Sequence, residues 1–216
     1  MFVKIKRVID FTLSVVGIAV LLPLSFVLIL AIKLESRGPI FFKQTRVGLH
    51  KKHFNILKFR TMRIDTPQDM PTHLLDNPDQ FITKVGKFLR KTSLDELPQM
   101  WNILKGDMSI IGPRPALWNQ YDLIAERDKY EVNDILPGLT GWAQINGRDE
   151  LPIEEKAKLD AYYVKNMNIR MDFKCFFGTF LSVLKSDGVS EGGPKDTVTD
   201  KKKETAHNEE DSNNRC

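Results

Sequence analysis

An uncharged, largely apolar run of 22 residues, Phe11 to Ile32, constrains this chain more than any other feature of its sequence. A helix rises about 1.5 Å per residue, so this run is long enough to cross the hydrocarbon core of a bilayer, which is about 30 Å thick. The run is too long for a signal peptide, and no small-residue cleavage site follows it. The sequence therefore predicts a membrane helix.

Two features of the run bear on whether this helix spans the membrane or enters and leaves on one side. Basic residues flank both ends, so the positive-inside bias gives no preferred side for translocation. Pro23 lies near the middle, where it removes a backbone hydrogen bond and bends a helix. We therefore favour a bent, re-entrant helix with its kink at Pro23, and keep the simple membrane span as the alternative.

The charge distribution indicates a polyanionic partner for the first third of the chain. The whole chain has a formal net charge of +4, yet residues 1–64 hold twelve Lys and Arg residues against only Asp10 and Glu35. Beside an apolar run, the favoured partner is an anionic membrane surface. Nucleic acid is the competing partner, but the chain carries no recognition motif for it, so we expect no nucleic-acid binding.

The cysteines and histidines argue against a disulfide framework and a zinc site. Two cysteines favour a reducing, cytoplasmic setting, with Cys175 as a small buried hydrophobe. The four histidines have no metal-ligand spacing. A magnesium ion held by carboxylate and phosphate oxygens is more compatible with this composition.

The apolar spacing predicts a small, mostly helical α+β fold. Pro39 to Arg60 alternates as two short strands around Gly48–Lys52. Helical periodicity indicates helices over residues 78–90, 94–105, 116–130, 154–166 and 171–185. The expected division is a basic flank and membrane helix in 1–36, a cytoplasmic domain in 37–190 and a disordered polar tail in 191–216. The aromatic face of the helix over 171–185 suits a core or a membrane interface about equally.

The stretch from Arg90 to Pro115 carries the candidate chemistry. Apolar residues recur at the spacing of one buried helix face, and Lys105–Gly106 provides a helix stop. The members of that face are Leu97, Met100, Trp101 and Leu104. Asp95 and Glu96 fall in the first turn of this helix, where either Ser93 is the N-cap of a capping box or Asp95 is the cap.

Capping alone would explain an isolated acidic pair, but two arginines accompany this one. Arg90 lies just upstream, and Arg114 lies between two prolines just beyond the helix. Fixed guanidinium groups beside a helix N-terminus make a phosphate site, and a carboxylate there can act as nucleophile or metal ligand. These residues suggest phosphoryl transfer.

Three long motifs, in order along the chain, resemble one known family. They are KFRTM from Lys58 to Met62, SLDELPQMWNILKGDMSIIGPRP from Ser93 to Pro115, and PGLTGWAQINGR from Pro137 to Arg148. Together they resemble the bacterial sugar transferase family, the monotopic polyprenyl-phosphate phosphoglycosyl transferases. The likeness extends to about Ser190 and is closest to the short members that act on modified acetamido sugars.

The resemblance implies residue roles. Asp95 would be the nucleophile, Glu96 a metal ligand or proton acceptor, and both acids would hold Mg²⁺. The substrate phosphates would be bound by Arg90, Arg114, Arg148, Lys58 and Arg60.

The resemblance also implies a reaction and a place. The chain would transfer a phospho-sugar from a UDP-sugar to membrane polyprenyl (undecaprenyl) phosphate through an aspartyl intermediate, at the cytoplasmic face of the bacterial inner membrane. Downstream glycosyltransferases are implied partners, and UDP-galactose or a UDP-N-acetylhexosamine is the alternative donor. Two other classes stay open: a metal-dependent hydrolase using the same acids, and a membrane-surface scaffold without catalysis.

Overall fold

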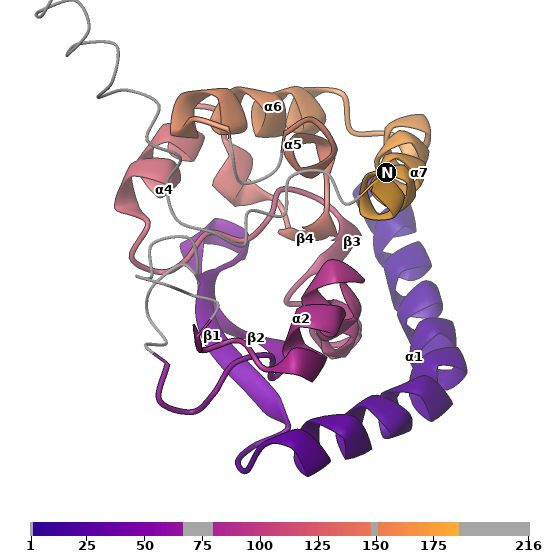
Figure 1. The fold of residues 1–216 in the computed structure, drawn as a ribbon. Coiled ribbons are helices and arrows are strands. Elements are labelled where there is room, and N and C mark those ends of the chain that lie inside the picture. Colours follow the sequence, from indigo (N-terminus) through magenta and orange to yellow (C-terminus); the bar gives the residue numbers. More distant parts are fainter. Residues whose placement is uncertain (1, 67–79, 148–150, 186–216) are drawn as a thin grey trace, which may run out of the picture.

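The computed structural model of this chain describes residues 2–66, 80–147 and 151–185. It is mostly helical with two small strand pairs, which confirms the predicted α+β class (Figure 1). The predicted tail of residues 191–216 lies outside the described residues. The elements that matter below are α1 (Phe2–Glu35), β1 (Phe41–Val47), β2 (His53–Phe59), α2 (Lys84–Lys91), the 3₁₀ helix η4 (Leu94–Gln99), α3 (Met100–Lys105), β3 (Ser109–Ile111), α4 (Tyr121–Asp128), β4 (Gly138–Thr140), α5 (Trp142–Ile145), α6 (Ile153–Lys165) and α7 (Ile169–Lys185).

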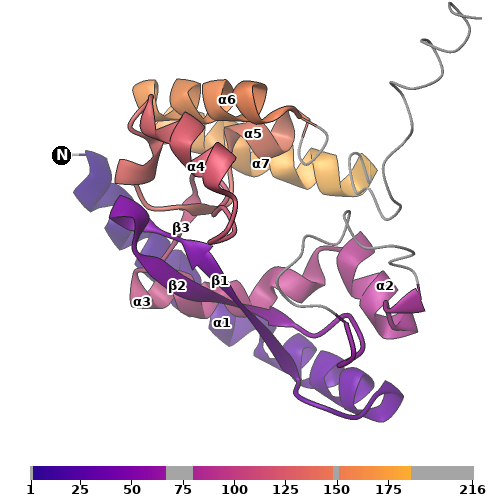
Figure 2. The ribbon, with the colours of Figure 1, turned by 90° about the vertical axis from the view of Figure 1, so that its left-hand side faces the viewer.

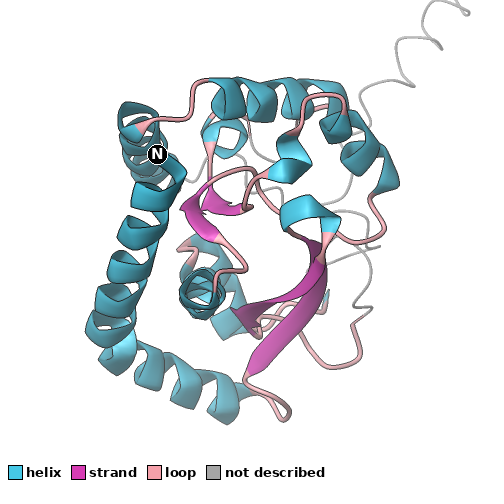
Figure 3. Cartoon of the chain, turned by 180° about the vertical axis from the view of Figure 1, so that it is seen from behind, coloured by secondary structure: helices cyan, strands magenta, loops and turns pink. Residues whose placement is uncertain are grey.

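α1 runs down one side of the molecule and then bends sharply beneath the rest (Figures 1 and 3). Pro23 lies inside this helix, as expected for a kink, because proline donates no backbone hydrogen bond. Among the described residues, α1 is the one helix long and apolar enough to cross a membrane. Most of its apolar side chains are exposed, including Val20, Leu22 and Phe26. These features indicate membrane association.

The half of α1 before Pro23 is bound to the rest of the chain by polar side chains. The Asp10 carboxylate accepts hydrogen bonds from the Ile110 backbone N–H (3.1 Å) and the Ser109 hydroxyl (2.7 Å), both on β3. Lys6 pairs with Asp172 of α7 at 2.6 Å. A carboxylate within an apolar helix is costly in lipid, so these contacts explain why Asp10 is buried against protein.

The half of α1 after Pro23 is bound by apolar packing and by a helix cap. Leu28 and Ile32 are buried in a cluster with Phe59 of β2 and Leu89 of α2. At the end of α1, the Glu35 carboxylate accepts from the first two backbone N–H groups of α2, at 2.7 and 2.9 Å. These are donors that a helix start leaves unpaired. Both halves of α1 therefore hold the same folded unit.

The two strand pairs lie between α1 and the helices α4 to α6 (Figure 2). β1 and β2 form the predicted antiparallel hairpin, with Phe41 opposite Phe59 and Val47 opposite His53. β3 pairs with β4 in parallel, a contact that the sequence analysis did not predict.

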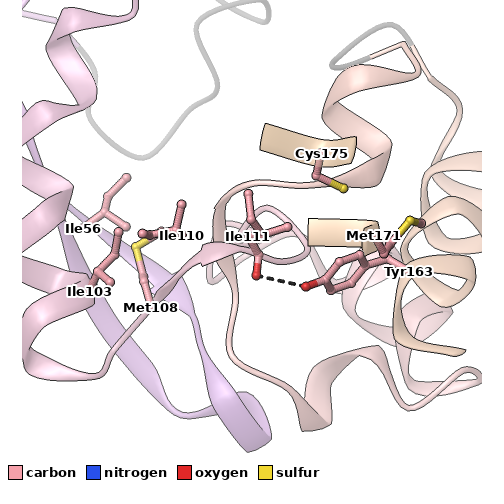
Figure 4. Close-up of a cluster of buried hydrophobic side chains, with 8 residues drawn as sticks. All are labelled: Ile56, Ile103, Met108, Ile110, Ile111, Tyr163, Met171 and Cys175. Carbon is pink, nitrogen blue, oxygen red and sulfur yellow. Dashed lines mark hydrogen bonds between the residues drawn. The ribbon is translucent and has the colours of Figure 1, made fainter. Parts of the chain in front are cut away.

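A buried cluster links the hairpin to the C-terminal helices (Figure 4). Ile110 and Ile111 of β3 lie in its middle, and the Tyr163 hydroxyl donates to the Ile111 carbonyl at 3.2 Å. Cys175 is fully buried here, as predicted. The cluster fixes β3, and β3 leads directly into the segment that carries Arg114.

The single helix predicted from residue 94 is wrong in its first half. The chain forms the 3₁₀ helix η4 and only then α3, since Pro98 cannot supply an α-helical N–H. Ser93 has a left-handed backbone (φ 56°) and its side chain makes no capping hydrogen bond, while Asp95 lies inside η4, so neither of the two caps that the sequence left open is formed. Trp101 is 50% exposed rather than buried. The predicted stop at Gly106 is confirmed by its φ of 96°.

The other helices agree with the prediction except at some ends and faces. α2 begins at Lys84 with Thr83 as its N-cap, whereas the predicted start at residue 78 lies outside the described residues. α4 begins at Tyr121, five residues later than predicted, while α6 and α7 lie close to the predicted ranges. Phe88 of α2 is 56% exposed although it belongs to an apolar helical pattern.

The aromatic face of α7 is not part of the core. Phe173, Phe176, Phe177 and Phe180 are more than half exposed, whereas Met171 and Cys175 on the opposite side are buried. Of the two alternatives left open for this face, core packing is therefore excluded.

Candidate active site

Glu96 is held by two cations from different parts of the chain. Its Oε1 atom accepts from Lys58 Nζ and from Arg114 Nη2, each at 2.7 Å. Lys58 is on β2, and Arg114 is in the loop after β3. Two of the predicted phosphate-binding residues are thus brought to the acidic pair, and both contact Glu96.

Asp95 is in different surroundings although it is the adjacent residue. Its side chain is buried, and its carboxylate accepts no hydrogen bond from the described residues. The nearest cation among the described residues is Lys58, whose Nζ lies 3.8 Å from Asp95 Oδ2, beyond hydrogen-bonding distance. The carboxylate is therefore largely buried, and no donor of the described residues occupies it.

These surroundings shift the pKa values of the two acids in opposite directions. Burial raises the pKa of Asp95, and the Glu96 charge adds to the rise, while Lys58, Arg90 and Arg114 only partly oppose it. Burial would also raise the pKa of Glu96, but the charges and hydrogen bonds of Arg114 and Lys58 outweigh it and hold that pKa well below its usual range. Adjacent carboxyl groups with divergent pKa values are typical of catalytic sites.

Asn102 binds α3, the helix that directly follows η4, to β2. Its Oδ1 accepts from the Leu57 backbone N–H at 3.0 Å, and its Nδ2 donates to the Asn55 carbonyl at 2.8 Å. The amide thus continues the strand's hydrogen bonding and keeps Lys58 opposite η4. Asn102 was not predicted from the sequence, because an asparagine within an apolar helical pattern does not indicate which backbone groups it will bind.

Arg90 reaches the site from α2. Its Nε donates to the Thr61 hydroxyl at 2.9 Å, and its charge helps to lower the pKa of Asp95. α2 approaches closely because Gly86 lies against the Thr61 backbone: a Cβ at Gly86 would come within 2.0 Å of the Thr61 carbonyl oxygen. Any larger residue at position 86 would push α2, and Arg90 with it, away from the site.

Of the two other predicted phosphate ligands, Arg60 lies away from the acidic pair and Arg148 falls outside the described residues. Arg60 is buried, and its guanidinium donates to the Arg37 carbonyl at 2.6 Å and to the Ser36 carbonyl at 2.8 Å, just after α1. It secures the end of the membrane helix, which the sequence pattern did not distinguish from phosphate binding. Arg148 lies in residues 148–150, outside the described residues.

The described part of the chain offers few metal ligands. Within residues 2–66, 80–147 and 151–185 there is no group of three or more His, Cys, Asp or Glu side chains that could hold a metal ion. The acidic pair supplies two carboxylates, and Oε2 of Glu96 accepts no hydrogen bond from the described residues. Beyond these two carboxylates, an ion bound here would take its ligands from substrate, water or residues outside the described ranges.

Comparison with known proteins gives one consistent result. The sequence model of the family described as bacterial sugar transferase matches residues 2–186. The chain is 40% identical over 188 residues to the uncharacterized sugar transferase EpsL of Bacillus subtilis, covering 87% of this chain and 91% of that one. It is 40% identical over 189 residues to the UDP-glucose:undecaprenyl-phosphate glucose-1-phosphate transferase of Escherichia coli, covering 84% of this chain.

A third relative carries a different sugar in its name. The UDP-N-acetylgalactosamine-undecaprenyl-phosphate N-acetylgalactosaminephosphotransferase of Aeromonas hydrophila is 39% identical over 191 residues, covering 85% of this chain. This chain spans only 44% of that protein and 40% of the Escherichia coli one. The family match over residues 2–186 spans the acidic pair, Lys58 and Arg114.

Proposed function

Because this chain belongs to the bacterial sugar transferase family, we propose that it transfers a phospho-sugar from a UDP-sugar to membrane polyprenyl phosphate. The products are UMP and a polyprenyl diphosphate-linked sugar, the first lipid-linked unit of a glycan. The relatives named as undecaprenyl-phosphate transferases support this reaction class.

The reaction proceeds through two displacements at one phosphorus. An oxygen of Asp95 attacks the sugar-linked phosphorus of the UDP-sugar, and the bond to the bridging oxygen breaks, so UMP leaves with that oxygen. A phosphate oxygen of the polyprenyl phosphate then attacks the same phosphorus. The bond to Asp95 breaks, and its carboxylate is regenerated.

The observation that carries this assignment is the state of the Asp95 carboxylate. It is buried, receives no hydrogen bond from the described residues and lies 3.8 Å from the Lys58 ammonium. A carboxylate that is largely buried and accepts no hydrogen bond from the described residues keeps its electron pairs available for attack. Glu96, tied by two short bonds on one oxygen, is poorly suited to that role.

The surroundings of Glu96 favour one of the two roles left open for it, metal ligand or proton acceptor. A carboxyl group whose pKa is held well below its usual range is a weak proton acceptor. Neither displacement needs one, because Asp95 attacks as a carboxylate and a lipid phosphate is anionic at neutral pH. We therefore assign Glu96 as metal ligand and anchor for Arg114 and Lys58.

Mg²⁺ fits this donor set. The ion commonly takes one or two protein carboxylates and completes its shell with substrate phosphates and water. Asp95 and Glu96 would hold it, and it would neutralise charge on the phosphates during transfer. Arg90 and Arg114 then supply guanidinium donors for the remaining phosphate oxygens, once the ligand competes with Glu96 for Arg114.

We also propose that α1 is re-entrant. Its first half is bound to β3 and α7 through Asp10 and Lys6, and its end is bound to α2 through Glu35. A helix whose two ends hold the same folded unit cannot have them on opposite sides of a bilayer. With Pro23 at the kink, the helix enters and leaves on the cytoplasmic face, and the exposed aromatic side of α7 lies in the interface.

The experiment that tests the function is nucleotide release by the purified, detergent-solubilised protein with Mg²⁺. Donors are UDP-linked acetamido sugars first, then UDP-galactose, UDP-glucose and UDP-N-acetylhexosamines, each with and without polyprenyl phosphate. A stoichiometric burst of UMP without lipid and continuous release with lipid are expected. Continuous UMP release at the same rate with and without polyprenyl phosphate would indicate a hydrolase. No UMP release from any donor would favour a non-catalytic scaffold.

A further inference from the structure

The segment that carries Arg114 is fixed by three consecutive backbone carbonyls. The carbonyl before Arg114 accepts from the Gly138 N–H at the start of β4 (2.8 Å), and the carbonyl after it accepts from the Arg46 guanidinium of β1 (3.1 Å). Between them, the Arg114 carbonyl accepts from Nη1 of Arg127, in the last turn of α4, at 2.9 Å. Three elements thus determine where the Arg114 side chain starts.

Arg127 is itself fixed by a carboxylate on α6. Its Nε and Nη2 atoms both donate to Asp160 Oδ2, at 2.9 and 2.5 Å. The side chains of Arg127 and Asp160 are only 4% and 1% exposed. All three guanidinium nitrogens are therefore used, two on α6 and one on the Arg114 carbonyl. Lysine could not reproduce this planar arrangement.

This ion pair is poorly explained by stability alone. Oδ1 of Asp160 is buried without a hydrogen-bond partner among the described residues. Burial also raises the pKa of this carboxyl, although the Arg127 charge opposes the rise. Apolar side chains of similar volume often stabilise a core as well as a buried ion pair does. What they cannot provide is a donor directed at the Arg114 carbonyl.

We propose that Arg127, held by Asp160, is a positioning residue that acts through the Arg114 carbonyl to aim the Arg114 guanidinium at Glu96. This inference rests on the proposed function, because aiming Arg114 matters only if Glu96 and Arg114 serve the transfer. The contacts run without a break from α6 to the acidic pair, ending at the 2.7 Å bond between Arg114 Nη2 and Glu96 Oε1. Arg127 itself need not touch substrate.

A paired apolar substitution separates positioning from folding. Arg127→Met alone would leave the Asp160 charge buried without a partner, whereas Arg127→Met with Asp160→Leu removes both charges together. We expect the paired variant to keep a melting temperature near that of the wild type. Its kcat/KM for transfer should fall about 10- to 100-fold, the scale expected when a group shifts by up to about 1 Å.

An Arg114→Ala background shows whether the effect passes through Arg114. There the paired variant should cause almost no further loss, because the side chain that it aims is absent. The matched control is Lys6→Met with Asp172→Asn, which replaces the buried ion pair between α1 and α7. The control's effect should be equal in both backgrounds. Equal losses from the Arg127 pair in both backgrounds would overturn the proposal.

Hydrogen exchange of the ligand-free protein provides a test independent of activity. The Gly138 amide, bonded to the carbonyl before Arg114, should exchange about 10-fold faster in the paired variant. Exchange at wild-type rates there would overturn the proposal. If the wild type releases no UMP from any donor, the proposed function fails, yet this exchange measurement still decides whether Arg127 fixes the segment.

Discussion

Asp95 and Glu96 are adjacent on η4, yet their carboxylates have contrasting surroundings. Glu96 is neutralised by Lys58 and Arg114, each 2.7 Å from the same oxygen. Asp95 is buried with no hydrogen bond from the described residues and with Lys58 at 3.8 Å. The same cations therefore bind one of two neighbouring acids firmly and leave the other available to react.

The largest expected effect comes from removing the reactive acid. Asp95→Asn keeps the shape of the side chain but deletes the attacking oxygen anion, so UMP release should fall about 10⁴-fold or more. Steady-state release with saturating UDP-sugar and lipid measures it. Asp122→Asn, the same change at an exposed position of α4, is the control and should be close to wild type. Near-full activity of Asp95→Asn would exclude this residue as nucleophile.

Removing the satisfied acid should affect both activity and stability. In Glu96→Gln, Lys58 and Arg114 lose the anion between them, so the transfer rate should fall about 100- to 1,000-fold. The free energy of unfolding in urea should drop by about 2–3 kcal/mol, as charge-assisted hydrogen bonds are lost. If Glu96→Gln had the wild-type free energy of unfolding and the wild-type transfer rate, the contrast drawn between Glu96 and Asp95 would be contradicted.

Lys58 pairs with Glu96 at 2.7 Å and lies 3.8 Å from Asp95, so its removal should change how the UMP burst depends on pH. Its charge is the largest influence that lowers the pKa of Asp95. In Lys58→Met, Asp95 should become harder to ionise, so the acid limb of the lipid-independent UMP burst should move to higher pH. Omitting lipid removes the titration of the lipid phosphate. Arg90→Met should move the acid limb less, because Arg90 lowers the pKa of Asp95 less than Lys58 does. An acid limb that moves to lower pH in Lys58→Met would contradict the assignment of Asp95 as the titrating nucleophile.

The smallest expected effect is a gain in stability. Because the folded protein raises the pKa of Asp95, the ionised form costs free energy at every pH above that raised value. Asp95→Asn should therefore unfold with about 0.5–2 kcal/mol more free energy at pH 7 in EDTA. The gain should shrink as the pH falls through the raised pKa and vanish below the ordinary value of 3.8. A loss of stability at pH 7 would mean that Asp95 supports the fold instead.

The sequence predicted the fold class, the hairpin and the kinked apolar helix, and it named Asp95 and Glu96 as the candidate acidic pair. These depend on local patterns and on a long motif. It did not predict that Ser93 adopts a left-handed backbone, or that Trp101 is exposed while Asn102 is buried against β2. Those outcomes depend on contacts between segments that are far apart in the sequence.

For the arginines, the sequence pattern did not distinguish those that contact the acidic pair from those that stabilise other parts of the fold. Arg114 and Arg60 lie in equally persuasive motifs, yet one contacts Glu96 and the other secures the end of α1. Arg127 gave no signal, because a helical arginine resembles a surface charge until its buried partner Asp160 is known. A basic residue in the sequence indicates that it will bind an acceptor, but only the tertiary contacts show which group that acceptor is.

The role of Asp95 as nucleophile can be tested by the mass of the protein after incubation with Mg²⁺ and a productive UDP-sugar, without lipid acceptor. The intact mass should increase by one phospho-sugar, and peptide mapping after rapid acid quenching should place the addition on Asp95. Added polyprenyl phosphate should then remove it. UMP release without any adduct, or an adduct that persists in Asp95→Asn, would contradict Asp95 as the nucleophile.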